Sequence, residues 1–263
     1  MRRESFSLLR PAAFRGRIVA PAIPARGKCE VPTCPLGIAW ADEWLGGGLQ
    51  GDGLHEFFAG DTQSLPSGLG FALILAMMPG GVRDGGVVWL RRGTAGVPYG
   101  PGLVDLGLDP GAITILSLAD DRALLRATLD TVRSGAVGAV LLEAVGRQPL
   151  LDLTATRRLV VAAAETGTLV LIVRASAEPG LSAAHSRWRV GSAPSRPLAA
   201  DAPGFPVFDL SLLRLRGGRE GLNILLEWNR DTASFREAGA ALSGGASAVA
   251  GGAERADPHG RAA

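Results

Sequence analysis

The stretch Gly53–Ala76, GLHEFFAGDTQSLPSGLGFALILA, decides the fold. It starts as a short apolar strand, continues as a loop of small residues, and leads into an apolar helix that we expect to begin near Ser67. A strand, a glycine-containing loop and a helix N-terminus, in this order, form the cradle that holds phosphate groups in many α/β proteins. The stretch therefore predicts the core of a nucleotide-binding scaffold.

The loop in this stretch lacks the chemistry of a working phosphate loop. The motif G-x-x-x-x-G-K-[ST] needs a lysine that reaches the β- and γ-phosphates and a hydroxyl that binds magnesium. Here Gly60 is followed by seven residues before Gly68, and Lys28 is the only lysine of the chain. We interpret the loop as a degenerate phosphate-loop remnant without a catalytic residue, represented by Gly60, Ser67, Gly68 and Gly70.

Apolar strands alternate with helices on the C-terminal side of this stretch. Strands are expected at residues 87–90, 113–118, 137–142 and 169–173, and helices at 69–78, 121–133 and 152–166. Asp120 or Asp121 and Asp152 are the expected N-caps of the last two helices, and Gly167 is the expected C-terminal stop of the second. Strands that are apolar along their whole length are typical of sheets covered on both faces. The pattern predicts an α/β fold with a mostly parallel β-sheet flanked by helices.

The ends of the core carry further local signals. Residues 36–53 fit a short amphipathic helix that is stopped by the glycine triplet at 46–48. SRWRV, at 186–190, fits an additional short strand. Two strand-like runs at 207–216 and 222–229, joined through Gly217 and Gly218, predict a C-terminal β-hairpin.

The 263 residues suit one substantial domain with tails, or two small domains. Residues 1–35 are proline-broken and basic, and we expect a largely flexible N-terminal arm. Residues 1–30 hold seven basic and two acidic side chains, so their net charge is +5. Such an arm either contacts an acidic partner or nucleic acid, or is a merely solvated terminus. Residues 36–230 form the expected core, and the Ala/Gly-rich residues 231–263 are expected to be a disordered tail.

Several classes of protein are disfavoured by composition. No apolar run is long enough for a transmembrane helix, and arginines interrupt the N-terminus where a signal peptide needs a continuous apolar segment. We expect a cytoplasmic protein, although an Arg-rich leader can also resemble an organelle transit peptide. Cys29 and Cys34 are the only thiols and are expected to be free. They cannot complete a zinc site, because the three histidines show no ligand spacing, so no metal is expected: His55, His185 and His259.

Charged residues stand where two of the expected strands end. Arg91 and Arg92 follow the strand at 87–90, and Glu143 follows the strand at 137–142. Ligands of parallel sheets usually bind at this end, so the arginines either contact an anion or a partner, or hold Glu143 in a structural ion pair. Arg187 and Arg189 are further candidates for anion or partner contacts. Arginine makes up 26 of the 27 basic residues, which a GC-rich genome would also explain.

The order of these motifs resembles the RecA-like core over residues 36–229. The resemblance is carried by LGIAWADEWLGGGLQGDGLHEFFAG (36–60) and by LGLDPGAITILSLADDRALLRATLDTVRSGAVGAVLLEAVG (106–146), with SGAV at 134–137 as its clearest local match. Within that superfamily the chain resembles the ImuA family, the damage-inducible mutagenesis proteins of bacterial translesion cassettes. The lysine-free loop, RWRV (187–190) and LLRLRGGREGLNILLEWN (212–229) carry this narrower resemblance.

The resemblance implies a protein without ATPase activity or cofactor. RecA-type ATPases carry an acidic catalytic residue where this chain has Arg91 and Arg92, and a Walker B Asp where it has Glu143. Glu143 is therefore expected to be a Walker B remnant. Without the lysine and hydroxyl, little is left to stabilise the charge that develops during phosphoryl transfer.

The resemblance further implies an adaptor in SOS-induced, error-prone translesion DNA synthesis. Its expected partners are an inactive Y-family polymerase homologue (ImuB), an α-subunit-type polymerase and RecA itself. Two alternatives stay open on the sequence. One is a RecA-like module that binds nucleotide or single-stranded DNA without hydrolysis, with the basic arm supplying salt-dependent affinity. The other is a SulA-type cell-division inhibitor, although this chain keeps a fuller core and both tails.

Overall fold

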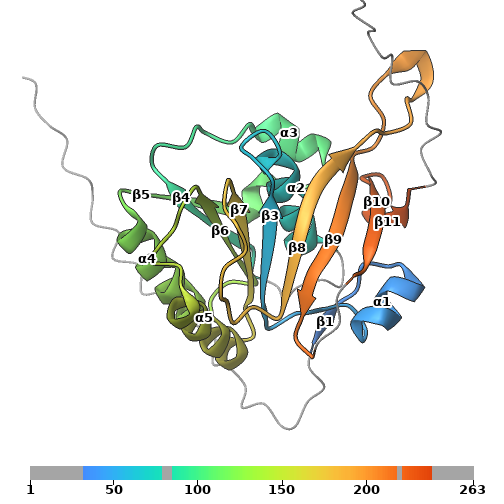
Figure 1. Cartoon of the computed structure of the whole chain (residues 1–263). Helices are drawn as coiled ribbons and strands as arrows, with labels where there is room; N and C mark the ends of the chain where they lie inside the picture. The colour runs from blue at the N-terminus through green and yellow to red at the C-terminus, as the bar shows by residue number, and fades with distance from the viewer. Residues whose placement is uncertain (1–31, 79–84, 218–220, 239–263) are drawn as a thin grey trace, which may run out of the picture.

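The computed structural model of the chain describes residues 32–78, 85–217 and 221–238. These residues form a nine-stranded sheet in the order β11-β10-β9-β8-β3-β7-β6-β4-β5 (Figure 1). The strands are β3 (Leu54–Ala59), β4 (Val87–Arg92), β5 (Ile113–Leu118), β6 (Ala139–Val145), β7 (Leu169–Ala175), β8 (Ser186–Ala193), β9 (Val207–Leu215), β10 (Asn223–Asn229) and β11 (Ser234–Glu237). From β8 through β3 to β5 all neighbours pair in parallel, whereas β8, β9, β10 and β11 pair in antiparallel fashion. The predicted α/β class and the mostly parallel sheet are confirmed.

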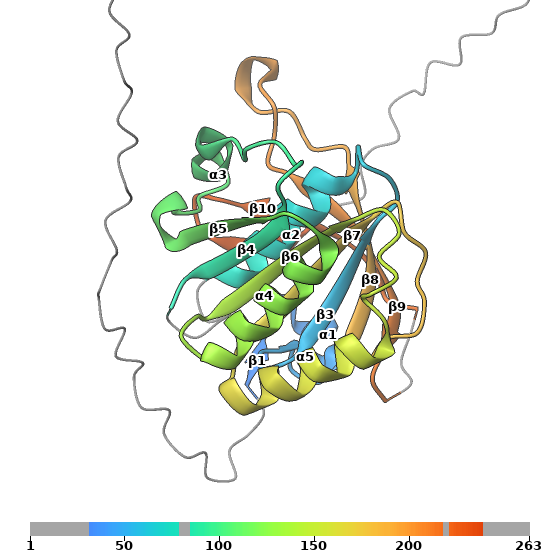
Figure 2. The ribbon, with the colours of Figure 1, turned by 90° about the vertical axis from the view of Figure 1, so that its left-hand side faces the viewer.

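Helices cover both faces of this sheet. The apolar helix α2 (Leu65–Met77) packs on one face together with α1 (Ala39–Leu45) and α3 (Gly100–Asp105). On the opposite face lie α4 (Asp121–Ser134) and α5 (Leu153–Thr166), side by side in Figure 2. Each layer has its own apolar core, because the side chains of a strand point alternately to the two faces. Phe57 packs in the α2 layer, for example, and its neighbour on β3, Leu54, packs in the α4–α5 layer.

Local signals in the sequence fix the helix ends. The side chains of Asp120 and Asp152 accept hydrogen bonds of 2.8 Å from the backbone N–H groups of Ala123 and Ala155, which confirms them as N-caps. Gly167 ends α5 with a φ of 76°. At Gly48 a positive φ of 118° coincides with a close approach, since a Cβ atom there would lie 2.5 Å from the carbonyl oxygen of Cys34.

Three predicted boundaries were wrong. The helix α2 begins at Leu65, not near Ser67. Thr33 and Cys34, assigned to the flexible arm, form β1 and pair with β2 (Leu49–Gln50). The tail predicted to be disordered from residue 231 includes β11, whose Phe235 is buried among aromatic rings and lies 5.0 Å from Trp228 and 5.7 Å from Phe71 between ring centroids. Residues 1–31 and 239–263, the rest of the predicted arm and tail, lie outside the described residues.

The remaining predictions for the ends of the core hold with small shifts. β9 and β10 are the predicted antiparallel hairpin, and the strand predicted at 186–190 extends to Ala193 as β8. Cys34 is a free, buried thiol. Burial, with a smaller contribution from the charge of Asp42, raises the pKa of Cys34 to about 12. Cys29 lies outside the described residues.

A buried histidine joins β3 to its neighbours. The Nε2 of His55 donates to the carbonyl of Gln50 at 2.9 Å, and its Nδ1 accepts from the hydroxyl of Ser186 at 2.6 Å. The indole N–H of Trp188 donates to the same hydroxyl oxygen at 2.7 Å. The neutral imidazole satisfies all of these bonds. Burial lowers the pKa of His55 to about 4, the Gln50 bond opposes this shift, and His185 adds to it.

This arrangement predicts acid-sensitive stability. His55 takes up its proton at about pH 4 in the folded chain, but at about pH 6.5 when unfolded. The unfolded state therefore binds more protons between these values, and stability is lost as the pH falls from about 6.5 to about 4. Compared with a His55→Gln variant, the wild type should lose about 2 kcal/mol more of its free energy of unfolding between pH 7 and pH 5. Denaturant titrations at both pH values measure this. Parallel pH curves for the two proteins would contradict the prediction.

Candidate functional site

A hollow of about 560 Å³ lies at the carboxyl ends of β4 and β6, beside the start of α2. Ligands of open α/β sheets bind at this end of the strands. The hollow brings together residues that are far apart in the sequence, among them Leu65, Arg91, Arg92, Asp121, Glu143 and Arg147. Arg91, Arg92 and Glu143 therefore line the same hollow, as the alternative of an ion pair with Glu143 requires.

Glu143 is held by three contacts. Its Oε1 accepts a hydrogen bond of 3.1 Å from Nη2 of Arg91, and its Oε2 accepts one of 3.1 Å from the indole N–H of Trp89. The Nε of Arg91 also lies 3.1 Å from Oε2. The Glu143 side chain is only 3% exposed and that of Arg91 only 9%. Both carboxylate oxygens of Glu143 are therefore engaged by neighbours from β4.

Arg91 is fixed from several sides as well. Its Nη1 donates to the carbonyl of Gly96 at 2.6 Å, and its guanidinium stacks over the ring of Trp89 at 5.0 Å. Of the two alternatives for the strand-end arginines, the structural ion pair with Glu143 is therefore the one that Arg91 adopts. Arg92 instead pairs with Asp121 at 2.6 Å, and this pair is about one third exposed. Arg147 is an exposed member of the hollow.

The residues assigned to the phosphate-loop remnant are separated in the structure. Gly60 lies in the loop after β3, whereas Ser67, Gly68 and Gly70 lie within α2. Gly68 serves packing, because a Cβ atom there would lie 3.0 Å from Cγ1 of Val173. The predicted helix near Ser67 therefore includes both Gly68 and Gly70.

The first turn of α2 is poorly suited to hold a phosphate. Pro66 has no backbone N–H to donate. The N–H groups of Ser67 and Gly68 already bond to the carbonyl of Ser64, at 3.1 and 3.3 Å. In addition, the exposed Asp61 carboxylate accepts from the N–H of Ser64, which lowers the pKa of Asp61 and keeps a negative charge in the loop. A phosphate group would meet few donors and one anion here.

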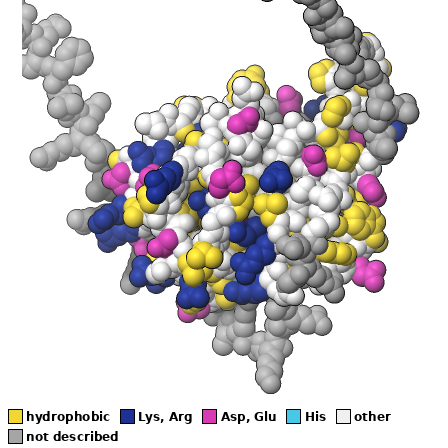
Figure 3. Space-filling model, viewed as in Figure 1, with side chains coloured by type: hydrophobic (Ala, Val, Ile, Leu, Met, Phe, Trp, Pro, Cys, Tyr) yellow, Lys and Arg dark blue, Asp and Glu magenta, His cyan; other side chains and the backbone are white. Residues whose placement is uncertain are grey.

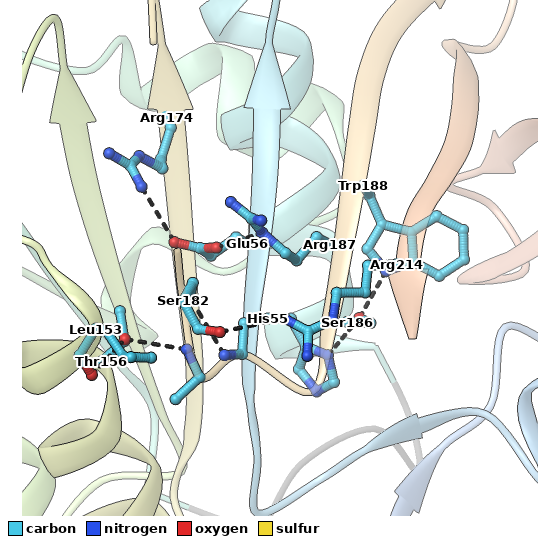
Figure 4. A network of polar contacts seen from close by, with 12 residues as sticks. His55, Glu56, Leu153, Thr156, Arg174, Ser182, Ser186, Arg187, Trp188 and Arg214 are labelled. Atoms are coloured by element: carbon cyan, nitrogen blue, oxygen red, sulfur yellow. Dashed lines mark hydrogen bonds and ion pairs between the residues drawn. The ribbon is translucent and has the colours of Figure 1, made fainter. Parts of the chain in front are cut away.

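Arg187 is not available to a partner. Its Nε donates to Oε2 of Glu56 at 2.8 Å, and Nη1 of Arg174 donates to Oε1 of the same carboxylate at 3.3 Å (Figure 4). The side chain of Glu56 is fully buried and both arginine side chains are 9% exposed. Both guanidinium groups also stack on Phe58, at 5.1 and 5.5 Å. The prediction of Arg187 as an anion or partner contact is therefore corrected, and only Arg189 of that pair is exposed.

The sequence reasoning missed Glu56, Arg174 and Trp89. A signal was present for the two charged residues, because each stands in a strand that is otherwise almost wholly apolar: LHEFFA for Glu56 and LVLIVRA for Arg174. A single charge in a buried strand needs a partner on a neighbouring strand. Nothing in the sequence marked Trp89 as a donor to Glu143.

Comparison with known proteins decides the family. No family model matches the chain. Protein ImuA of Caulobacter vibrioides (strain NA1000 / CB15N) is 32% identical over 190 residues, which cover 67% of this chain and 75% of the relative. Protein ImuA of strain ATCC 19089 / CIP 103742 / CB 15 matches to the same extent. The chain belongs to the ImuA family.

Family membership confirms the resemblance drawn from the loop and the closing strands. The site of this ImuA-family chain holds a carboxylate that is already paired with a cation from its own sheet. Within the described part of the chain, no helix is long and apolar enough to cross a lipid bilayer.

The Arg91–Glu143 pair predicts a characteristic double-mutant cycle. Arg91→Met or Glu143→Leu alone leaves one buried charge without its partner and should cost about 3–5 kcal/mol of unfolding free energy. The double variant Arg91→Met/Glu143→Leu removes both charges and should recover most of that loss. Urea denaturation of the four proteins measures the coupling. The part-buried pair Arg92–Asp121 gives the control, because Arg92→Met should cost less than either single change in the buried pair. Additive losses at Arg91 and Glu143 would show that the pair is not coupled.

Proposed function

We propose that the chain is a non-catalytic adaptor of SOS-induced, error-prone translesion DNA synthesis. Membership of the ImuA family supports the link to damage-induced mutagenesis. The observation that carries the non-catalytic part is the closed Arg91–Glu143–Trp89 network at the strand ends. Both carboxylate oxygens of Glu143 already accept a hydrogen bond within the sheet and the side chain is only 3% exposed, which disfavours direct coordination of a magnesium ion.

We further propose that the core is RecA-like. In support, β3, which leads into the glycine-containing loop, lies next to β7, and β6, which carries Glu143, lies on the other side of β7. The loop and Glu143 therefore meet at one end of the sheet, as the phosphate loop and the Walker B acid do in RecA-type ATPases. Under this proposal, the position of the nucleotide site is retained, and the side chains that would bind and hydrolyse the nucleotide are replaced.

The replaced groups are those on which phosphoryl transfer depends. Leu69 stands in α2 where the phosphate-binding lysine is expected, and Arg91 stands where the catalytic acid is expected. Losing such contacts typically costs several kcal/mol of transition-state stabilisation, or several orders of magnitude in rate.

The proposal predicts that the purified chain does not hydrolyse ATP. Phosphate release under single-turnover conditions, with or without single-stranded DNA, should not exceed that of buffer, because no lysine or free acid acts on the γ-phosphate. Activity in the wild type that is lost in a Glu143→Gln variant would overturn this prediction. The conservative glutamine keeps the size of the side chain, so a folded variant can be compared with the wild type.

An adaptor needs surfaces that stay in place without nucleotide turnover. The core meets this need, because both of its layers are formed, and the buried carboxylates Glu143 and Glu56 are paired, by residues of the chain itself. The proposed partners are an inactive Y-family polymerase homologue (ImuB) and an α-subunit-type polymerase, with RecA as a third. Among the readings left open by the sequence, family membership favours this one over a SulA-type inhibitor of cell division.

A non-hydrolysing nucleotide or single-stranded DNA module is the second candidate. The 560 Å³ hollow with its three arginines is the observation in its favour. Two of these arginines are already neutralised, Arg91 by Glu143 and Arg92 by Asp121, so Arg147 alone is left to attract an anion. Fluorescence anisotropy with an oligonucleotide over a salt series separates the two candidates, since an adaptor needs no DNA affinity of its own.

The adaptor proposal also predicts a stable complex with the two polymerase-type partners. Size-exclusion chromatography of the chain mixed at micromolar concentration with the ImuB-type protein and the α-subunit-type polymerase should give a common peak. The complex should form equally well with and without ATP, because the site does not cycle. Separate elution of all three proteins would overturn the adaptor proposal.

A further inference from the structure

A groove runs between α4 and α5 on the outer side of the molecule. It has a volume of about 380 Å³. One wall is a single stripe of α4 at i, i+3, i+4 and i+7 spacing, and the other is formed by α5, with the exposed Leu150 at one end. The lining residues are Arg122, Leu125, Arg126 and Leu129 of α4, Ala155, Arg158 and Leu159 of α5, and Leu150.

The floor of the groove is aliphatic. Leu159 is buried against the sheet, and Leu125 and Leu129 are half-buried, with the rest of their surface open to the groove. Leu150 is 43% exposed. This apolar surface remains in contact with water after the core has formed. A partner that covers it would therefore be stabilised by the burial of the exposed leucine side chains.

The rim of the groove is cationic and unneutralised. Arg122, Arg126 and Arg158 are exposed, and none of them makes a hydrogen bond or ion pair with another described residue. No acidic side chain is among the described residues that line the groove, and Asp121 of the same helix is taken by Arg92. Figure 3 shows basic side chains over the part of the molecule formed by α4 and α5, with apolar and some acidic side chains among them.

We infer that this groove between α4 and α5 is the docking site for an acidic amphipathic helix of a partner protein. A stripe of aliphatic side chains would lie on the leucines, and Asp or Glu on either side of it would pair with the three arginines. The inference rests on the proposed adaptor function and gives it a surface and a kind of ligand. The charge pattern also selects against basic helices, because they would bring like charges together.

The composition of the groove favours a peptide over nucleic acid. Single-stranded DNA binds through cations along its backbone and through aromatic side chains on which the bases stack. Leucines and one alanine form the floor here, and no aromatic residue is among the described residues that line it. A phosphate backbone would leave this aliphatic surface uncovered.

The test uses the full chain and three fluorescent probes. The first is a synthetic helical peptide with leucines at i, i+3, i+4 and i+7 and glutamates on either side. The second is the same peptide with lysines in place of glutamates, and the third is oligothymidylate. In anisotropy titrations the acidic peptide should bind about ten-fold tighter or more than either of the others. The triple variant Arg122→Glu/Arg126→Glu/Arg158→Glu should lose about ten-fold or more of that affinity, and Leu150→Ser should weaken it without altering its salt dependence.

Arg157→Glu is the matched control, because Arg157 is exposed on the same helix but does not line the groove. Its affinity for the acidic peptide should stay within about two-fold of the wild type. Equal binding of the acidic and basic peptides, preferential binding of oligothymidylate, or dimers of the chain that dissociate in the triple variant would each overturn the inference.

The polymerase-type partners supply the second arm. Hydrogen exchange of the wild-type complex should show protection of α4 and α5, and the triple variant should bind at least one partner about ten-fold more weakly. If the triple variant binds both partners as tightly as the wild type, the inferred docking role of the groove is wrong, and the proposed adaptor function is unaffected. A wild-type chain that binds no partner overturns the adaptor function, and the peptide titrations then still decide the groove.

Discussion

A carboxylate on a buried parallel strand must be neutralised by a cation within reach of the same sheet, and the structure depends on how this chain meets that constraint. An isolated buried charge costs several kcal/mol, even after relaxation and water penetration. Glu56 on β3 is met by Arg187 from β8 and Arg174 from β7, and Glu143 on β6 is met by Arg91 from β4. The two clusters link β8, β3 and β7 on one side of the sheet and β6 and β4 on the other, so they fix which strands are neighbours as well as balancing charge. The site at the strand ends is therefore a consequence of how the sheet is held together.

Much of the fold could be predicted because it depends on local signals. Asp120 and Asp152 are N-caps whose chemistry is visible in the sequence, and Gly167 ends its helix for a reason that the sequence also shows. The apolar strands β3, β6 and β7 identified a sheet covered on both faces, whereas β5, at its edge, is apolar in sequence but largely exposed. The errors arose where distant packing decides the outcome. Phe235 stands in a short, Ala-rich stretch with no periodicity, and it becomes part of a strand only because Trp228, Phe71 and Phe208 leave a place for an aromatic ring.

The site could be predicted only in part, namely where the order of the elements alone decides which residues lie together. Parallel strands bring their carboxyl ends to one edge, so the proximity of Arg91 and Glu143 followed from the order of the elements. The order of the elements did not show which arginine would pair with Glu143. Arg91 and Arg92 point to opposite faces of β4, and the register of the strand decides which of them faces Glu143. Arg187 was misassigned because a basic residue in a strand-like run looks the same whether it faces solvent or a buried carboxylate on the adjacent strand. Gly68 shows a similar ambiguity, since a small residue in the first turns of a helix serves a phosphate loop and close helix–sheet packing equally well.

The position of β11 has a consequence for how the protein is made. The strand at Ser234–Glu237 closes one edge of the sheet, and its Phe235 covers the rings of Phe71, Phe208 and Trp228. During synthesis these rings stay uncovered until residue 237 has left the ribosome, and exposed apolar surface of this kind is what chaperones and proteases recognise in incomplete chains. A chain that terminates before β11 therefore leaves this aromatic surface open to chaperones and proteases.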